Sequence, residues 1–213
     1  MSALPARLLM VTDRRQASAP LDVIAAAAVE AGLRWIWLRD RDLDAFERRA
    51  LAERLLEIAH RHGARLSIGG DVDLACEVAA DGVHLAAGAS AEDVAAARGR
   101  LGDQALIGVS VHGAGEIAAA TGADYVTLSP IFTTESKPGY GPALGLAALA
   151  RAARLEIPVL ALGGVTAARA AACRRVGAAG VAVMGNLMRA AARPGGVQAA
   201  VQALSRALSA EAA

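Results

Sequence analysis

The feature that most constrains the fold is the alternation of short apolar segments with longer helical patterns. The apolar segments span residues 7–12, 34–39, 65–68, 82–85, 105–110, 124–129, 158–162 and 180–184. The helical patterns that follow them span residues 21–32, 42–63, 71–79, 90–101, 113–122, 145–155, 166–177 and 186–191, with a last helix near 196–210. Short, almost wholly apolar strands are typical of a parallel sheet that is buried on both faces. Eight such units predict an α/β fold, a (β/α)8 TIM barrel formed as a single domain by residues 1–213.

The alternative to a barrel is a doubly wound open sheet. No G-x-G-x-x-G fingerprint follows the first apolar segment, which disfavours that alternative. The expected helix ends agree with the segment boundaries, because a glycine is favoured just after a helix, where the backbone takes positive φ. These terminal glycines are Gly32, Gly63, Gly122 and Gly177.

Composition excludes several classes of partner. The chain has 22 basic and 21 acidic residues and a net charge of +1, so neither a nucleic acid nor a membrane surface is expected as a partner. No apolar run reaches the roughly 18 residues of a membrane span. Cys76 and Cys173 fit neither a disulfide framework nor a metal site. With no signal-peptide pattern, a cytoplasmic protein is expected, and a homo-oligomer stays open.

The barrel prediction directs attention to the residues that follow each strand, since active sites lie at the carboxyl ends of barrel strands. The seventh and eighth segments end in the sequences LGGVT and VMGN. Gly163, Gly164 and Gly185 there would let backbone N–H groups approach a phosphate, next to a helix N-terminus. The alternative is a pair of tight turns that need positive φ. Their position on strands seven and eight favours the phosphate interpretation.

The segment after the sixth strand, residues 129–145, contains Lys137, the only lysine among 22 basic residues. Thr133, Thr134 and Ser136 add hydroxyl donors beside it. A lysine ammonium is a compact point charge with freely rotating donors, unlike the flat guanidinium of arginine. Lys137 is therefore predicted to contact a phosphate oxygen or a leaving group, the alternative being an exposed loop lysine.

Charged residues follow the second and third strands as well. Arg39 and Arg41 lie two positions apart and are predicted to clamp a pyrophosphate; the alternative is ion pairing with Asp40, Asp42 or Asp44. Asp71 either holds Mg²⁺ together with substrate phosphates or caps the helix that follows it. Other arginines, Arg48 among them, are predicted to lie on solvated helix faces.

Two histidines follow the fourth and fifth strands. His84 is predicted to be a packed, hydrogen-bonded core residue. His112 would lie at the active face, where a neutral imidazole can move protons near pH 7. Whether His112 is catalytic or structural stays open from the residues alone.

Taken in order, the motifs LLMVTD, ADGVHL, IGVSVH, GADYVTLSPIFTTESKPG, IPVLALGGVT and GAAGVAVM resemble the thiamine phosphate synthase and TenI family over nearly the whole chain. The resemblance implies a transferase of thiamine biosynthesis that joins hydroxymethylpyrimidine pyrophosphate to thiazole phosphate and releases pyrophosphate, with Mg²⁺. It also implies roles for individual residues. The pyrophosphate and metal would be handled by Arg39, Arg41, Asp71, Ser110 and Lys137. The thiazole phosphate would lie among Thr134, Ser136, Gly164, Val183 and Gly185.

The chain departs from the family pattern on the pyrophosphate side. Trp37 replaces a glutamine, Arg41 a lysine and Gly70 an asparagine, and Ala89 stands where a second Mg²⁺ carboxylate is expected. Glu92 and Asp93 lie near Ala89 but fit the first turn of a helix better. Trp37 either reshapes the pyrimidine pocket or only packs against its own strand.

These departures leave two further functions open. One is a TenI-type thiazole tautomerase, an isomerase that would use His112. The other is a non-catalytic sensor that binds a phosphate ligand of the thiamine pathway. The Thr134, Ser136 and Lys137 element favours the synthase, which is the main prediction.

Overall fold

The computed structural model describes residues 4–134 and 142–209, and its eight strands close into a barrel in the order β1 to β8. The strands are β1 Leu8–Val11, β2 Trp35–Leu38, β3 Arg65–Gly69, β4 Gly82–Leu85, β5 Leu106–Val111, β6 Tyr125–Leu128, β7 Val159–Leu162 and β8 Gly180–Val183. Every neighbouring pair is parallel, and β1 closes the barrel by pairing with β8, with Leu9 opposite Ala182. The predicted (β/α)8 barrel is confirmed.

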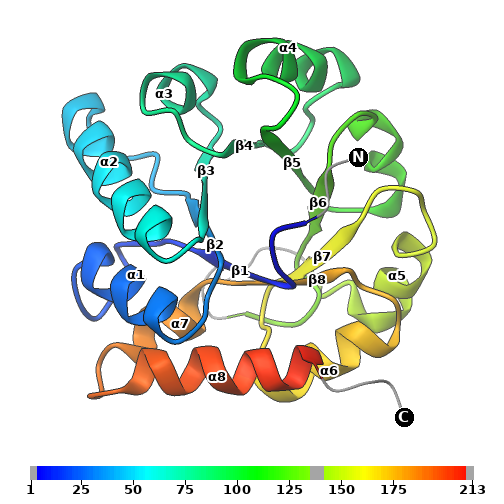
Figure 1. Cartoon of the computed structure of the whole chain (residues 1–213). Coiled ribbons are helices and arrows are strands. Elements are labelled where there is room, and N and C mark those ends of the chain that lie inside the picture. The colour runs from blue at the N-terminus through cyan, green and yellow to red at the C-terminus, as the bar shows by residue number, and fades with distance from the viewer. Residues whose placement is uncertain (1–3, 135–141, 210–213) are drawn as a thin grey trace.

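A ring of helices surrounds these strands (Figure 1). It consists of α1 Leu21–Glu30, α2 Ala45–Arg61, α3 Val72–Glu77, α4 Ala91–Leu101, α5 Gly145–Ala152, α6 Ala167–Arg175, α7 Gly185–Ala190 and α8 Gly196–Ser209. Gly32, Gly63, Gly122 and Gly177 all have positive φ, as the sequence predicts. Among the described residues, no helix is both long and apolar enough to cross a membrane.

One predicted helix is wrong. Residues 113–122 form two short 3-10 turns, η1 Ala114–Glu116 and η2 Ala118–Ala120, instead of an α-helix. Gly113 has no side chain with which to cap a helix, and Gly115 weakens the first turn. The segment is too short for its alanines to compensate for these two glycines.

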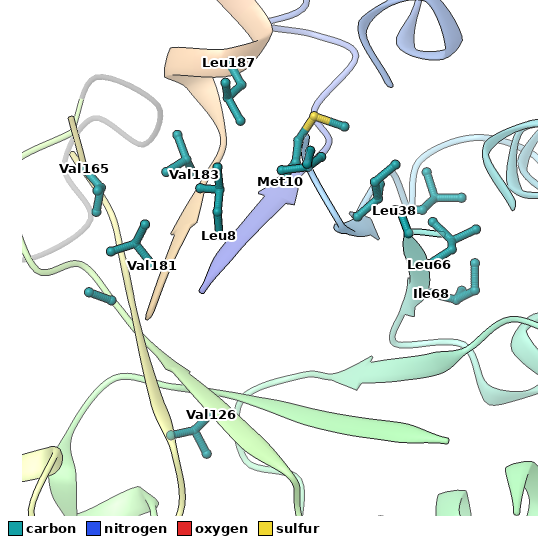
Figure 2. Packing of buried hydrophobic residues seen from close by; sticks show 14 of the residues in the cluster. Leu8, Met10, Leu38, Leu66, Ile68, Val126, Val165, Val181, Val183 and Leu187 are labelled. Carbon is teal, nitrogen blue, oxygen red and sulfur yellow. The ribbon is translucent and has the colours of Figure 1, made fainter. Parts of the chain in front are cut away.

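Alternate residues of most strands enter two separate apolar layers. Leu8 and Met10 of β1, with Val181 and Val183 of β8, belong to the outer layer between strands and helices (Figure 2). The inner layer fills the barrel and contains Leu9, Val11, Trp35, Trp37, Leu106, Tyr125, Leu160 and Ala182. Because both faces of the strands are buried, the strands read as continuous apolar runs in the sequence.

Glycines provide the space for the large aromatic side chains of the inner layer. Trp35 and Tyr125 meet edge to face with ring centroids 4.6 Å apart. A Cβ atom at Gly108 would lie 2.2 Å from the Tyr125 ring and 2.5 Å from Nδ1 of His84. Gly108 is therefore required by contact distance, not by backbone conformation.

This packing predicts opposite effects for two glycine-to-alanine changes. Gly108→Ala should lower the free energy of unfolding by about 2 to 3 kcal/mol or more, because the added methyl overpacks the barrel interior. Gly99→Ala, in α4 where a Cβ would meet open space, should raise it by about 0.5 to 1 kcal/mol. Urea denaturation of both variants measures the difference. Equal stabilities would contradict the packing described here.

Candidate active site

A cavity of about 1550 Å³ opens at the carboxyl ends of the strands. Most of the residues predicted for the site line it, namely Arg39, Arg41, Ser110, His112, Thr133, Thr134, Gly163, Gly164, Val183 and Gly185. Gly70 and Asp71, after β3, are not among its lining residues. Ser136 and Lys137 lie outside the described residues. The side chain of Val183 belongs to the outer apolar layer, so Val183 offers the cavity mainly its backbone.

Two arginines give one end of the cavity a positive charge. The Arg41 guanidinium lies against Gly70, where a Cβ would be 2.6 Å from Nη2. Partial burial, followed by the charges of Arg48 and Arg39, lowers the pKa of Arg41. Nη1 of Arg39 is 3.7 Å from Asp13 Oδ2, which is a loose contact. In the part of the chain that the structure describes, no carboxylate pairs with Arg41.

The alternative partners of these arginines are engaged elsewhere. Asp42 forms ion pairs with Arg14 and Arg15, each at 2.7 Å. Asp44 caps α2 by accepting a hydrogen bond from the backbone N–H of Glu47. The alternative to the predicted clamp, pairing of Arg39 or Arg41 with Asp40, Asp42 or Asp44, is therefore absent from the described residues.

Asp40 holds the ends of β1 and β2 together, a role that the sequence analysis missed. Its buried carboxylate accepts a 2.6 Å hydrogen bond from the Thr12 hydroxyl and a 2.7 Å bond from the backbone N–H of Arg14. The Thr12 hydroxyl oxygen in turn accepts from the backbone N–H of Arg39 at 2.9 Å. This network fixes the backbone from which Arg39 reaches into the cavity.

The opposite end of the cavity is built on the turn after β7. Gly163 and Gly164 have φ of +97° and +62°, so both need the conformation that glycine tolerates. A Cβ at Gly164 would also lie 2.4 Å from the carbonyl oxygen of Thr133, so the turn packs directly on the segment after β6. The tight-turn interpretation is therefore confirmed for Gly163 and Gly164, and phosphate binding at this turn stays a prediction.

Arg169 adds a cation to this second end and was not predicted. It belongs to the first turn of α6, and its Nη1 donates a 2.7 Å hydrogen bond to the carbonyl oxygen of Gly164. Its guanidinium also lies 4.8 Å from the centroid of the Phe132 ring. These two contacts hold the charge beside the glycine turn, where it lines the cavity.

The two histidines occupy different environments. His84 is fully buried, as predicted, and its ring packs on Trp37 with centroids 3.8 Å apart. Burial, with a smaller contribution from Arg41, lowers the pKa of His84 to about 3. His112 lines the cavity, and its Nδ1 lies 3.0 Å from the carbonyl oxygen of Ser129. Since a carbonyl only accepts, Nδ1 of His112 carries the proton in this contact.

Comparisons with known proteins agree with this geometry. A family model described as thiamine monophosphate synthase matches residues 8–187. The thiamine-phosphate synthase of Roseiflexus castenholzii is 40% identical over 187 residues, which cover 85% of this chain and 80% of the relative. That of Salinispora tropica is 38% identical over 211 residues, covering 96% of this chain and 100% of the relative. The structure of thiamine phosphate pyrophosphorylase from Pyrococcus furiosus aligns with a TM-score of 0.79 at 27% identity over 95% of both chains.

Mg²⁺ is implied by the family resemblance, and the described residues do not fit a dedicated site for it. Within these residues, no group of three or more His, Cys, Asp or Glu side chains could hold a metal ion. One oxygen of Asp71 accepts from the backbone N–H of Leu74 at 2.9 Å and so caps α3. The other oxygen forms a 2.7 Å ion pair with Arg48. Asp93 completes the capping box of α4 with Ser90, as its sequence position indicates.

Arg48 corrects a sequence prediction. It was expected on a solvated helix face, yet it is only 8% exposed. Its Nη2 donates a 2.7 Å hydrogen bond to the carbonyl oxygen of Gly69 while Nη1 binds Asp71. Such a buried charge needs a partner. Asp71 is therefore positioned as a structural carboxylate that joins α2 to the end of β3.

Substitution of Asp71 separates its two contacts. Asp71→Asn keeps a cap but loses the ion pair, and should lower the free energy of unfolding by about 1 to 3 kcal/mol. Asp71→Ala should cost about 1 kcal/mol more because the cap is lost too. Asp73→Asn, which removes only an exposed pair with Arg100, should change stability by about 0.5 kcal/mol or less. Denaturation in urea measures all three. If Asp71→Asn leaves stability unchanged but the variant needs a higher Mg²⁺ concentration for activity, the Asp71 carboxylate binds a metal ion instead.

Proposed function

Because the chain belongs to the thiamine monophosphate synthase family, we propose that it is a thiamine phosphate synthase. This transferase joins hydroxymethylpyrimidine pyrophosphate to thiazole phosphate. Homologous thiamine-phosphate synthases align over most of the chain, which supports this reaction over the alternatives. The small-molecule substrates would bind in the cavity at the carboxyl ends of the strands.

One observation supports the assignment independently of the relatives, namely that a single cavity has two separate ends suited to anions. Arg39 and Arg41 provide one end, after β2. The Gly163–Gly164 turn and Arg169 provide the other, after β7. Guanidinium groups and exposed backbone N–H groups both favour phosphate oxygens. A reaction between two phosphorylated molecules needs two such ends.

The chemistry follows from where these charges lie. The bond between the pyrimidine methylene carbon and the pyrophosphate oxygen breaks, and its electron pair leaves with pyrophosphate. The thiazole nitrogen then donates its lone pair to the methylene carbon and forms the new C–N bond. Arg39 and Arg41 would stabilise the charge that develops on the departing pyrophosphate, which is electrostatic catalysis. Ser110, which also lines the cavity, would donate a hydrogen bond to the same group.

Lys137 and Ser136 keep their proposed roles, although they lie outside the described residues. Lys137 would be the third cation on the leaving group, where a point charge is more suitable than a planar guanidinium. Thr134 and Ser136 would add hydroxyl donors around the thiazole phosphate, together with the backbone of Gly164, Val183 and Gly185. The described residues do not form a site for Mg²⁺.

Removal of the Lys137 charge tests the proposed reaction. Purified protein given both substrates and Mg²⁺ should form thiamine phosphate. Lys137→Ala should reduce the rate by about 100-fold or more, as expected for loss of one electrostatic donor. Lys137→Arg should also be impaired, because the planar guanidinium of arginine cannot replace the compact ammonium of lysine.

Two results would contradict this assignment. A wild-type protein that isomerises a thiazole phosphate carboxylate, forms no thiamine phosphate and loses activity in His112→Ala would be the tautomerase. A protein that binds these phosphates and turns over neither would be the sensor.

Arg169 is predicted to act on one substrate only. Arg169→Gln should raise KM for thiazole phosphate by about tenfold, because a charged hydrogen bond is worth roughly 1.5 to 3 kcal/mol. KM for the pyrimidine pyrophosphate should stay within about twofold. The control is Arg175→Gln, an exposed arginine near the other end of the same helix. An equal effect on both KM values would indicate general electrostatic attraction and not a local contact.

A further inference from the structure

A chain of buried polar groups runs through the barrel interior and ends at the cavity. His84 lies in its middle, fully buried, with Nδ1 3.0 Å from the hydroxyl of Tyr125. Nε2 lies 3.0 Å from the hydroxyl oxygen of Ser110, which lines the cavity, and 3.2 Å from that of Thr127. The reaction proposed above uses neither His84 nor Tyr125.

The packing around His84 allows its ring only one position. Trp37 covers one face of the imidazole at 3.8 Å between centroids, and the Tyr125 ring lies 5.3 Å away. On β5, a Cβ at Gly108 would be 2.5 Å from Nδ1, so the backbone approaches the ring closely. Burial keeps the imidazole neutral at physiological pH. A neutral imidazole has one N–H donor and one acceptor nitrogen. If one nitrogen accepts a hydrogen bond from its neighbour, the other nitrogen must therefore donate to the next group.

The Tyr125 hydroxyl sets that direction. Among the described residues, the buried phenol has Nδ1 of His84 as its hydrogen-bond partner, at 3.0 Å. Burial raises the pKa of Tyr125, so the phenol keeps its proton. A buried hydroxyl proton that is left without an acceptor costs about 1 to 3 kcal/mol, so the Tyr125 hydroxyl donates to Nδ1 of His84.

We propose that His84 and Tyr125 are positioning residues that orient the Ser110 hydroxyl so that its proton points into the cavity. In this arrangement Nε2 of His84 carries the proton and donates it to the Ser110 oxygen. The Ser110 proton is then free to bind a phosphate oxygen of a substrate. With the opposite tautomer, Ser110 would donate to His84 and present only lone pairs to an anion.

This inference rests on the proposed function, because only an anionic substrate requires a donor at Ser110. Its position supports the assignment, since Ser110 lines the same cavity as Arg39 and Arg41. A hydroxyl that is already oriented needs no reorganisation when charge develops on the leaving group. Hydrogen bonds in such a series of polar groups also polarise one another, which makes the Ser110 hydroxyl a stronger donor.

The first test is the tautomer of His84, measured by ¹⁵N NMR on the ligand-free protein. The chain has four histidines, so a His84→Asn variant identifies the signal. We expect a protonated Nε2 and an unprotonated Nδ1 that do not titrate between about pH 5 and 9. Thr127→Val should leave this tautomer unchanged, because Thr127 is not needed as a donor to Nε2. A protonated Nδ1 in the wild type would overturn the proposal.

The second test is a double-mutant cycle between Tyr125 and Ser110. Tyr125→Phe keeps the ring contact with Trp35 but removes the donor to His84. It should lower kcat by about tenfold, the effect of one hydrogen bond, with little change in either KM. Ser110→Ala should lower kcat by about 100-fold. If Tyr125 acts through Ser110, Tyr125→Phe should have no further effect in the Ser110→Ala protein.

Independent, multiplicative losses in the double variant would show that Tyr125 has only a structural role, and would overturn the proposal. The two tests also separate this inference from the proposed function. An active synthase with a protonated Nδ1 at His84 would refute the positioning role and leave the function intact. A protein without synthase activity would refute the function, and the NMR result alone would then decide the orientation of Ser110.

Discussion

The interior of an eight-stranded barrel has to be filled by side chains from its own strands, and the rest of this structure depends on how that is done. Here two tryptophans and a tyrosine are the largest of the side chains that fill it. Close packing leaves no room for a second large residue opposite each of them. Glycines therefore face the aromatic rings, and Gly69 and Gly108 lie where a Cβ would be 2.8 Å from Trp37 and 2.2 Å from Tyr125.

The same packing determines where polar side chains replace apolar ones in the barrel interior. Towards the carboxyl ends of the strands, the apolar inner layer gives way to His84, whose Nε2 hydrogen-bonds both Thr127 and Ser110. Above them the loops contribute arginines at one end of the cavity and a glycine turn at the other. The apolar packing thus holds the base of the site rigid, while the charged groups that distinguish the substrates come from the loops.

Particular residues show how far the sequence predicts this arrangement. All eight strands were predictable because each is buried on both faces, and Arg39, Ser110 and His112 were found because parallel strands end at one face. The Arg48–Asp71 ion pair could not be predicted, because it joins residues 23 positions apart and the helical pattern alone places Arg48 in solvent. Arg169 was missed for a similar reason, because periodicity does not reveal that the first turn of α6 reaches back to Gly164.

Three of the four departures from the family pattern on the pyrophosphate side lie together in space, namely Trp37, Arg41 and Gly70. Gly70 has φ of +66°, and the Arg41 guanidinium occupies the position that its Cβ would take. A side chain at position 70 would therefore compete with the longer arginine at position 41. Trp37 packs beside them on His84, against Gly69. These three changes, which look like separate losses in the sequence, therefore lie in one corner of the site. There the Arg41 guanidinium lies against the backbone of Gly70. The neighbouring carboxylate of Asp71 pairs with Arg48 and does not line the cavity.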